Sequence, residues 1–184
     1  MTTALIIIDI QNDYFAGGNM ALEGSDEAAA NAASLLAHFR SRGLPVIHVQ
    51  HLMARPNAGY LMPGTVGADI HDSVAPLPGE TVVVKRFPNS FRDTILLDTL
   101  KPAGADRLVV AGMMTHMCID TSVRAAFDLG FKVALAHDAC ATRSLRFGDA
   151  TVAAAAAVQA SFIAALHGVF AEARATAEIE SSMA

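Results

Sequence analysis

Short apolar runs alternate along the chain with longer segments whose apolar residues recur at helical spacing. The runs are brief, rich in β-branched residues and bounded by glycine, proline or charge, which is typical of strands. Several are apolar at successive positions, which predicts parallel strands covered by helices on both faces. The five predicted strands are residues 4–10, 45–50, 81–86, 107–112 and 132–137, and a weaker sixth lies near 168–176.

Four segments between these runs are predicted helices. The first, 25–43, has Ser25 as its expected N-cap, acidic residues in its first turn, basic residues in its last turn and Gly43 as its expected C-cap. The others cover 90–104, 118–130 and 149–167. This alternation of strands and helices predicts an α/β fold, a three-layer sandwich with right-handed crossovers.

Size and charge narrow the class of protein. The 184 residues fit a single domain spanning 1–184. The formal net charge of -5 comes without a cluster of basic residues, so neither nucleic acid nor an anionic membrane surface is an expected partner. No apolar run approaches the roughly 20 residues that cross a bilayer. The N-terminal apolar run has no basic region before it and is interrupted by Asp9, which is unlike a signal peptide, so a cytoplasmic protein is expected.

Three polar residues fall at the carboxyl ends of predicted strands, where ligands bind in open parallel sheets. Asp9 closes the first strand, Lys85 ends the third, and Cys118 begins the helix after the fourth. A thiol at the start of a helix lies near unpaired backbone N–H groups and the positive end of the helix dipole, which favours a thiolate. Together the three supply a nucleophile, a base and a cation that positions the base.

Each of these residues also has a structural interpretation. A lone cysteine is often a small buried hydrophobic residue, an aspartate often caps a helix or pairs with a surface base, and a lysine at a strand end often reaches into solvent. Asp9 among apolar neighbours would be costly if buried without a partner, so Lys85 is its expected partner. Cys140 is predicted to be a structural free thiol, since disulfides are rare in a reducing compartment, and Asp138 is predicted to fix a loop.

Three stretches resemble the isochorismatase-like cysteine hydrolase superfamily, which includes nicotinamidases and N-carbamoylsarcosine amidohydrolase. They are LIIIDIQNDY near the start, VVKRFPNSF in the middle and VVAGMMTHMCIDTSVRAAFDLGFKVALAHDAC later. The resemblance covers nearly the whole chain and implies a Rossmann-like, mainly parallel six-stranded sheet with helices on both faces. It also implies Asp9, Lys85 and Cys118 as a catalytic triad, a cis peptide at Met113–Met114, and an oxyanion hole made by the N–H groups of Met114 and Cys118.

The activity that the resemblance implies is hydrolysis of a C–N bond in a small amide or ureido substrate, with no metal or organic cofactor. Asp9 takes the proton of Cys118, the thiolate attacks the carbonyl, and water hydrolyses the resulting thioester. The alternative is a protein that keeps this fold without hydrolase activity and acts as a small-ligand binding or scaffold protein. A dinucleotide-binding oxidoreductase is excluded, because QNDYFAGG follows the first strand in place of a G-x-G-x-x-G turn.

Departures within the family refine this hypothesis. Isochorismatases that cleave a vinyl ether lack the nucleophilic cysteine, so Cys118 favours C–N hydrolysis. Nicotinamidases carry an Asp-x-His pair and further histidines that bind a metal, where this chain reads VIHVQHLMARP. His48 and His51 lie three residues apart and so point to opposite faces of one strand, unless the strand ends between them. His48, His51 and His71 are therefore predicted to be structural, and no metal is predicted.

Further residues are candidates for substrate binding. Gln11 shares the strand face of Asp9, although it can equally satisfy local backbone groups. Segment 51–79, with four prolines and four glycines, is typical of a binding or lid segment, but residues 52–80 carry no pattern that identifies the substrate. A homo-oligomer is expected from the resemblance. The full set of substrate-binding candidates is Gln11, Phe87, Asn89, Phe91, Thr115 and His116, of which Phe91 can equally belong to the core.

Overall fold

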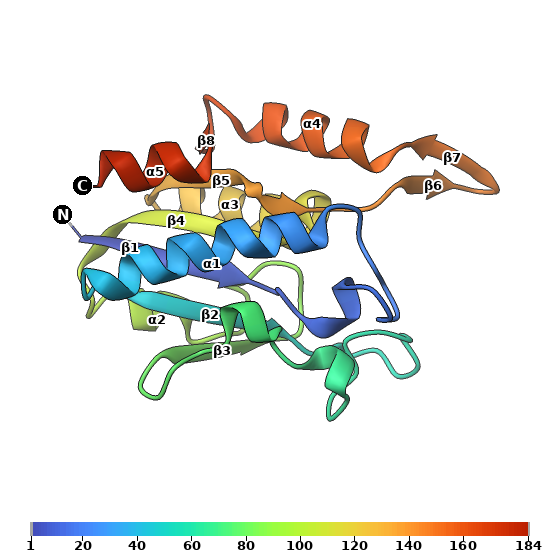
Figure 1. Ribbon diagram of the computed structural model, residues 1–184, viewed down its shortest axis with the longest axis horizontal. Coiled ribbons are helices and arrows are strands. Elements are labelled where there is room, and N and C mark those ends of the chain that lie inside the picture. The colour runs from blue at the N-terminus through green and yellow to red at the C-terminus, as the bar shows by residue number, and fades with distance from the viewer. Residues whose placement is uncertain (1, 184) are drawn as a thin grey trace.

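A six-stranded sheet, parallel at every pairing, forms the centre of the computed structural model, which describes residues 2–183 (Figure 1). Its order is β3-β2-β1-β4-β5-β8, so the chain starts in the middle, builds one half and then returns to build the other. This confirms the predicted α/β sandwich, including its sixth strand. The strands are β1 (Thr2–Ile8), β2 (Val46–His51), β3 (Thr81–Lys85), β4 (Ala105–Met113), β5 (Lys132–Ala141) and β8 (Glu172–Arg174).

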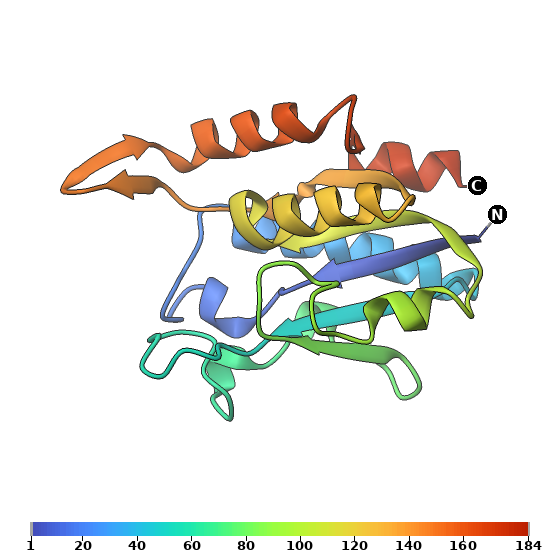
Figure 2. The ribbon, with the colours of Figure 1, turned by 180° about the vertical axis from the view of Figure 1, so that it is seen from behind.

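Helices cover both faces of the sheet (Figures 1 and 2). On one face lie α1 (Ser25–Ser41) and α5 (Thr176–Ser182). On the other lie α2 (Leu96–Leu100), α3 (Asp120–Asp128) and α4 (Ala155–Leu166). Among the described residues, no helix combines the length and the apolar character needed to cross a membrane.

The run of apolar residues in β1 is explained by burial on both faces. Leu5 and Ile7 pack on the α1 side, whereas Ile6 and Ile8 pack on the α2 and α3 side. Each of the four is at most 2% exposed. Full burial of one such side chain stabilises the fold by about 1.5–3 kcal/mol, so the alternating side chains of one strand bind both helical layers to the sheet.

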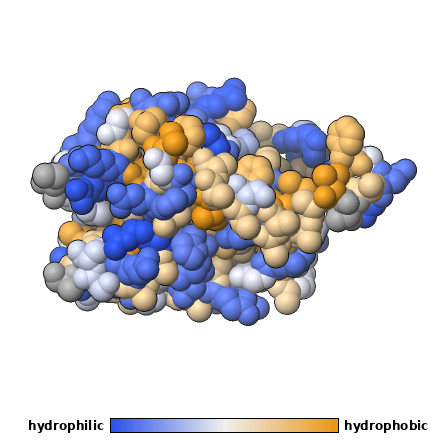
Figure 3. Space-filling view, turned by 90° about the horizontal axis from the view of Figure 1, so that it is seen from above, coloured by the Kyte–Doolittle hydropathy of each residue, from blue (hydrophilic) through white to orange (hydrophobic). Residues whose placement is uncertain are grey.

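Two predicted helices are shorter than expected. The segment 149–167 becomes helical only at Ala155, because β6 (Leu145–Phe147) and β7 (Ala150–Ala153) pair as an antiparallel hairpin that projects from the body (Figure 1). Figure 3 looks down on α4 and this hairpin and shows apolar surface along both. In 90–104 only α2 is α-helical; turns precede it, where Thr94 donates to the Ser90 carbonyl and Asp93 has a φ of 55°.

Helix α1 also begins differently from the prediction. Its N-cap is Gly24, with a φ of 73°, and Ser25 is the first helical residue. The Ser25 hydroxyl donates backwards to the Leu22 carbonyl at 3.4 Å, so it does not cap the helix N–H groups. Gly43 follows the C-cap Arg42 with a φ of 61°, the left-handed conformation that commonly ends helices.

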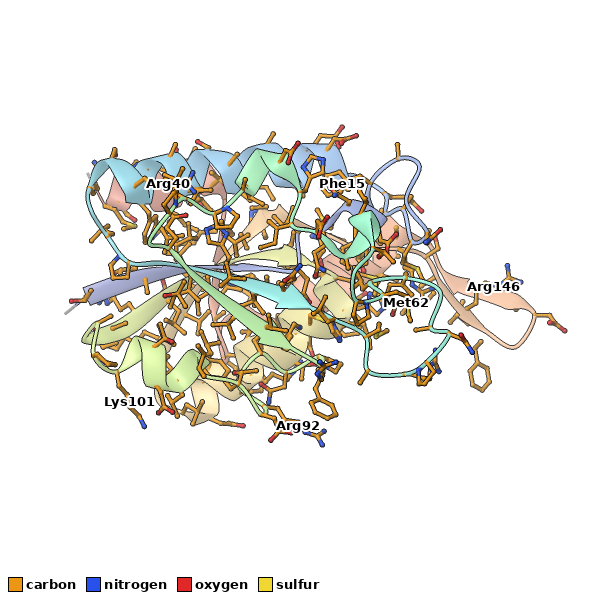
Figure 4. All side chains as sticks on the ribbon, turned by 90° about the horizontal axis from the view of Figure 1, so that it is seen from below. Phe15, Arg40, Met62, Arg92, Lys101 and Arg146 are labelled. Atoms are coloured by element: carbon orange, nitrogen blue, oxygen red, sulfur yellow. The ribbon has the colours of Figure 1, made fainter. Side chains whose placement is uncertain are left out.

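The long 51–79 segment is bound to the end of β1. It contains two short 3-10 helices, η2 (Val66–Ala68) and η3 (Asp72–Val74), and a third, η1 (Asn12–Tyr14), follows β1. The buried Asp13 carboxylate in η1 accepts the N–H of Leu61 at 2.6 Å. In Figure 4, Phe15 and Met62 lie on the side of the molecule toward which the strand arrows point, and Lys101 lies on the opposite side. The segment therefore lies at the carboxyl ends of the strands, as a binding segment would.

Candidate active site

Asp9 lies directly after β1 at the carboxyl edge of the sheet. Its φ is 53°, in the left-handed region that aspartate tolerates better than most residues, and this turn ends the strand. Its N–H still donates to the Val49 carbonyl of β2 at 3.0 Å. The side chain is fully buried, so its carboxylate needs a compensating charge.

Lys85, the last residue of β3, supplies that charge. Its Nζ lies 2.8 Å from Oδ2 of Asp9, and both side chains are 0% exposed. The same ammonium donates to the Pro88 carbonyl at 2.9 Å, which keeps it directed along the sheet edge. Burial alone would raise the pKa of Asp9, but Lys85 and then His51 outweigh it and hold that pKa below its usual range. Burial lowers the pKa of Lys85, yet the negative charge of Asp9 leaves it raised.

Cys118 occupies a different local structure from the predicted helix start. A π-helical turn, η4 (Thr115–Ile119), follows the cis peptide bond Met113–Met114 and runs into α3. Cys118 therefore lies inside the helical segment, and it is 3% exposed. Burial, followed by the neighbouring Asp9 carboxylate, raises the pKa of its thiol to about 12, although Lys85 opposes this. The predicted position of Cys118 at a helix start was wrong, and burial of the thiol outweighs the Lys85 cation, so the site does not favour the thiolate.

His51 is the site residue that the sequence did not identify. Its Nδ1 lies 3.7 Å from Oδ2 of Asp9 and 3.7 Å from Sγ of Cys118. It ends β2 and is in register with Lys85 of β3, so both reach the same edge of the sheet. Its position directly after a predicted strand could have identified it, because the carboxyl ends of adjacent parallel strands lie at the same edge of the sheet.

Asp9, His51 and Cys118 also form a group of possible metal ligands among the described residues. One donor atom each from Asp9, His51 and Cys118 lies within 4.8 Å of the others. The ammonium of Lys85 lies 2.8 Å from the Asp9 carboxylate and adds positive charge where a cation would bind. This charge makes the cluster better suited to moving protons than to holding a metal ion.

Two tyrosines lie close enough to this cluster to sense its charge. Tyr14 of η1 is 1% exposed, and burial, then negative charge at Cys118 and at Asp9, raises its pKa well above the usual value. Tyr60 of the long segment is half-buried, and burial followed by Cys118 raises its pKa too. Tyr60 of the 51–79 segment thus lies close enough to Cys118 for the charge of one group to affect the other.

Gln11 has a structural role in place of the predicted contact with substrate. Its Nε2 donates to the carbonyls of His51 at 3.0 Å and Ala68 at 2.6 Å, and its Oε1 accepts the His51 N–H at 2.9 Å. Both of its N–H donors are therefore engaged by backbone. Gln11 positions His51 and the long segment relative to β1.

Thr115 and His116 are tied to β5 and its continuation. The buried Thr115 hydroxyl donates to the Ala141 carbonyl at 3.2 Å. Nδ1 of His116 lies 2.5 Å from the Thr142 hydroxyl, and burial lowers the pKa of this half-buried histidine. These contacts hold the turn that carries Cys118 against the sheet.

The turn after β3 is organised by its own residues. The Arg92 guanidinium lies 3.7 Å over the ring of Phe87, and Oδ1 of Asn89 accepts the Phe91 N–H at 2.9 Å. Phe91 stacks on Phe131 and packs against the core, in agreement with its alternative interpretation. Phe87, Asn89 and Phe91 thus contact other residues of this chain. They lie around the turn whose Pro88 carbonyl accepts a hydrogen bond from Lys85.

The remaining singled-out residues have clear packing partners. His48 lies 3.0 Å from Glu80, and burial lowers its pKa despite that partner. His71 stacks on Phe15 at 3.7 Å between ring centroids. Cys140 is buried and contacts the Ala136 carbonyl at 3.3 Å. The Asp138 carboxylate accepts the N–H and the hydroxyl of Thr176 at 2.9 and 2.8 Å, which anchors the start of α5.

Two surface cavities lie away from the catalytic candidates. One, of about 390 Å³, lies between β4, β5, β8 and α5 and is lined in part by Phe127, Phe131 and Phe170. The other, of about 490 Å³, lies beside Arg40 and Glu80. The linings of both lack Asp9, Lys85 and Cys118, so the chemistry of the side chains, and not the size of a cavity, identifies the candidate site.

Comparison with known proteins agrees with this fold and site. The sequence model of the isochorismatase domain matches residues 3–166. The uncharacterized isochorismatase family protein YddQ of Bacillus subtilis (strain 168) is 51% identical over 176 residues, 96% of this chain and 97% of its own. A streptothricin hydrolase of Streptomyces noursei is 37% identical over 139 residues, 76% of this chain and 49% of its own. A crystal structure of an isochorismatase-family protein from Oleispira antarctica has a TM-score of 0.93 at 49% identity, covering 98% of this chain and 96% of that one. The chain belongs to the isochorismatase family of hydrolases, which confirms the resemblance.

Proposed function

We propose that this protein is a cysteine hydrolase that cleaves a C–N bond in a small amide or ureido substrate through a thioester on Cys118. The observation that carries the proposal is the buried ion pair of Asp9 and Lys85, 2.8 Å apart, beside a buried thiol. A scaffold protein would have no use for three ionisable groups in an apolar interior, because each is costly to desolvate. The similarity to a streptothricin hydrolase supports hydrolysis as the reaction class.

The reaction starts from a neutral thiol. Cys118 gives up its proton to a base in the site, which the family resemblance assigns to Asp9, and the sulfur attacks the substrate carbonyl. The backbone N–H groups of Met114 and Cys118 are the proposed donors to the oxyanion. The C–N bond breaks as its nitrogen takes up a proton, and water then hydrolyses the thioester. Lys85 favours the ionised form of Asp9 before that carboxylate takes up the proton and after it gives the proton away, since the ammonium of Lys85 lies beside it.

Release of ammonia or amine from a panel of small amides and ureido compounds tests the proposal. The Cys118→Ala variant should lose activity by about 10³-fold or more, because no other group in the site is an equivalent nucleophile. The matched control is Cys140→Ala, which removes the other thiol at a buried position outside the site. Mass spectrometry of acid-quenched reactions should show the acyl group on Cys118. Equal activity of Cys118→Ala and the wild type would refute the proposal.

A further inference from the structure

Arg143 follows the carboxyl end of β5, at the edge of the sheet that carries the catalytic candidates. The last residue of β5 is in register with the last residue of β4, directly before the turn that contains Cys118. Thr142 is held on two sides: its carbonyl accepts the Glu23 N–H at 3.3 Å, and its hydroxyl lies 2.5 Å from Nδ1 of His116. The backbone of Arg143 therefore starts from a fixed point beside that turn.

The guanidinium of Arg143 has unused hydrogen-bond donors. The residue is half-buried, and its Nε is buried without a hydrogen-bond partner among residues 2–183. Nη1 makes one long contact, 3.4 Å to the Ser144 carbonyl. Within the described part of the chain no carboxylate forms an ion pair with this guanidinium. Glu23 accepts from the Ser144 hydroxyl, and Asp120 already binds Arg124. Buried donors of a charged group are costly without an acceptor, so an anionic ligand would stabilise them.

Tyr60 is close to both the reactive sulfur and this guanidinium. Burial, followed by Cys118, raises the pKa of Tyr60, whereas Arg143 and then Arg55 oppose this. Burial, followed by Arg143, lowers the pKa of the half-buried His116. The charge of Arg143 thus acts on two side chains that adjoin the site. A small molecule held at Cys118 is within reach of this guanidinium.

The charges of the site leave one position for an anion. Lys85 is matched by Asp9 at 2.8 Å, whereas Arg143 has no matching acid among residues 2–183. We propose that Arg143 binds a carboxylate of the substrate, so that the substrates are small amides or ureido compounds with a carboxylate a few bonds from the scissile C–N bond. This rests on the proposed cysteine hydrolase function and names its substrate class. The planar guanidinium suits a carboxylate because two parallel N–H groups can bind its two oxygens.

Hydrolysis of matched probe pairs tests the inference. The members of each pair share a shape and differ in charge: succinamate against 4-methylpentanamide, and 3-ureidopropanoate against 3-methylbutylurea. In the wild type, kcat/KM for ammonia release should be about 10- to 100-fold higher for the carboxylate of each pair. A wild type that hydrolyses both members equally well would overturn this inference while the proposed function stands, and this readout needs no variant to fold.

Substitutions of Arg143 assign the preference to its guanidinium. In Arg143→Gln, kcat/KM for the carboxylates should fall by about 10- to 100-fold, with the neutral probes unchanged. Arg143→Lys keeps the charge but not the planar fork, and should retain part of the preference. Arg143→Glu should favour the cationic 4-aminobutanamide, a gain that loss of structure cannot produce. The matched control is Arg146→Gln, on the hairpin, where the arginine donates to the Asp149 carbonyl at 2.7 Å. A folded Arg143→Gln that keeps the full preference would overturn the assignment.

Protection of Cys118 from iodoacetamide separates binding from catalysis. Levulinate has a ketone where succinamate has its amide and cannot be hydrolysed, and 5-methylhexan-2-one is its neutral isostere. Levulinate should slow alkylation of Cys118 more than the neutral ketone does, and this difference should be lost in Arg143→Gln. That result with no amide hydrolysed would support the carboxylate site and count against the proposed function. Equal protection by the two compounds in the wild type would overturn the carboxylate site.

Discussion

Replacing Lys85 with methionine removes the positive charge of the buried pair while keeping a side chain of similar length. The carboxylate of Asp9, 0% exposed, is then left without its 2.8 Å partner. Removal of one partner from a buried ion pair costs about 3–5 kcal/mol, because the other charge stays desolvated. We therefore expect Lys85→Met to lower the free energy of unfolding by that amount, measured by urea titration at about pH 7.

The pH dependence has a definite sign. In the wild type the pKa of Asp9 is lowered, so its stabilising contribution is present above the unfolded pKa and is lost as the pH falls through the folded value. In Lys85→Met burial would raise this pKa, so the carboxyl takes up a proton as the pH falls. The stability difference between the two proteins should therefore shrink from about pH 8 to about pH 5.

A double-mutant cycle with Asp9→Asn is the control. The double variant contains no buried charge at this pair and should be less destabilised than Lys85→Met, by about 1–3 kcal/mol. Lys85→Met with the stability of the wild type, or effects that simply add in the double variant, would refute the reasoning. Such a result would mean that the two groups do not compensate each other in solution.

Three further predictions concern the stability of the fold and its assembly. A Cβ atom at Gly112, whose φ is 138°, would lie 1.9 Å from the Ile8 carbonyl oxygen, so Gly112→Ala should destabilise by about 3 kcal/mol or more in urea titrations. Gly130→Ala, with open space around its Cβ position, should cost only about 1 kcal/mol, and equal losses would contradict this argument. Hydrogen bonding by Arg40 holds the pKa of Glu80 at about 2, so Glu80→Gln should lose about 1–3 kcal/mol at neutral pH. That loss should vanish as the pH falls from the unfolded value towards about 2; a loss that is the same at every pH would argue against the ion pair. Finally, sedimentation equilibrium should give a multiple of the 19.2 kDa chain mass, and a monomer at micromolar concentration would end the expectation of a homo-oligomer.

The strands were predictable from the sequence because their runs are short, apolar and rich in β-branched residues, whereas their order in the sheet was not predicted. Apolar runs such as that of β1 are buried on both faces, which only a parallel sheet between two helical layers provides. The predicted helices were less reliable at their ends. Residues 149–153 were predicted as the start of a helix, but residues 145–153 pair as a hairpin. The pairing partner of a short strand cannot be read from the sequence of either strand alone.

The site was predictable in its catalytic candidates but not in its environment. Asp9, Lys85 and Cys118 stand out because polar residues at the carboxyl ends of parallel strands converge, and the Asp9–Lys85 contact follows that rule. His51 was assigned to a structural role, although its strand end meets the same edge. Gln11 was proposed for the substrate, but its amide bonds to backbone that arrives from 40 and 57 residues away.

Local patterning therefore decides the layers, the strand ends and which ionisable groups approach the edge, because periodicity and side-chain direction are properties of neighbouring residues. The tertiary structure decides the protonation state of Cys118 and the partners of His51. Both depend on burial and on charges contributed by β1, β2, β3 and η4 together. Those distances are set by packing across the sheet, and no local segment contains them.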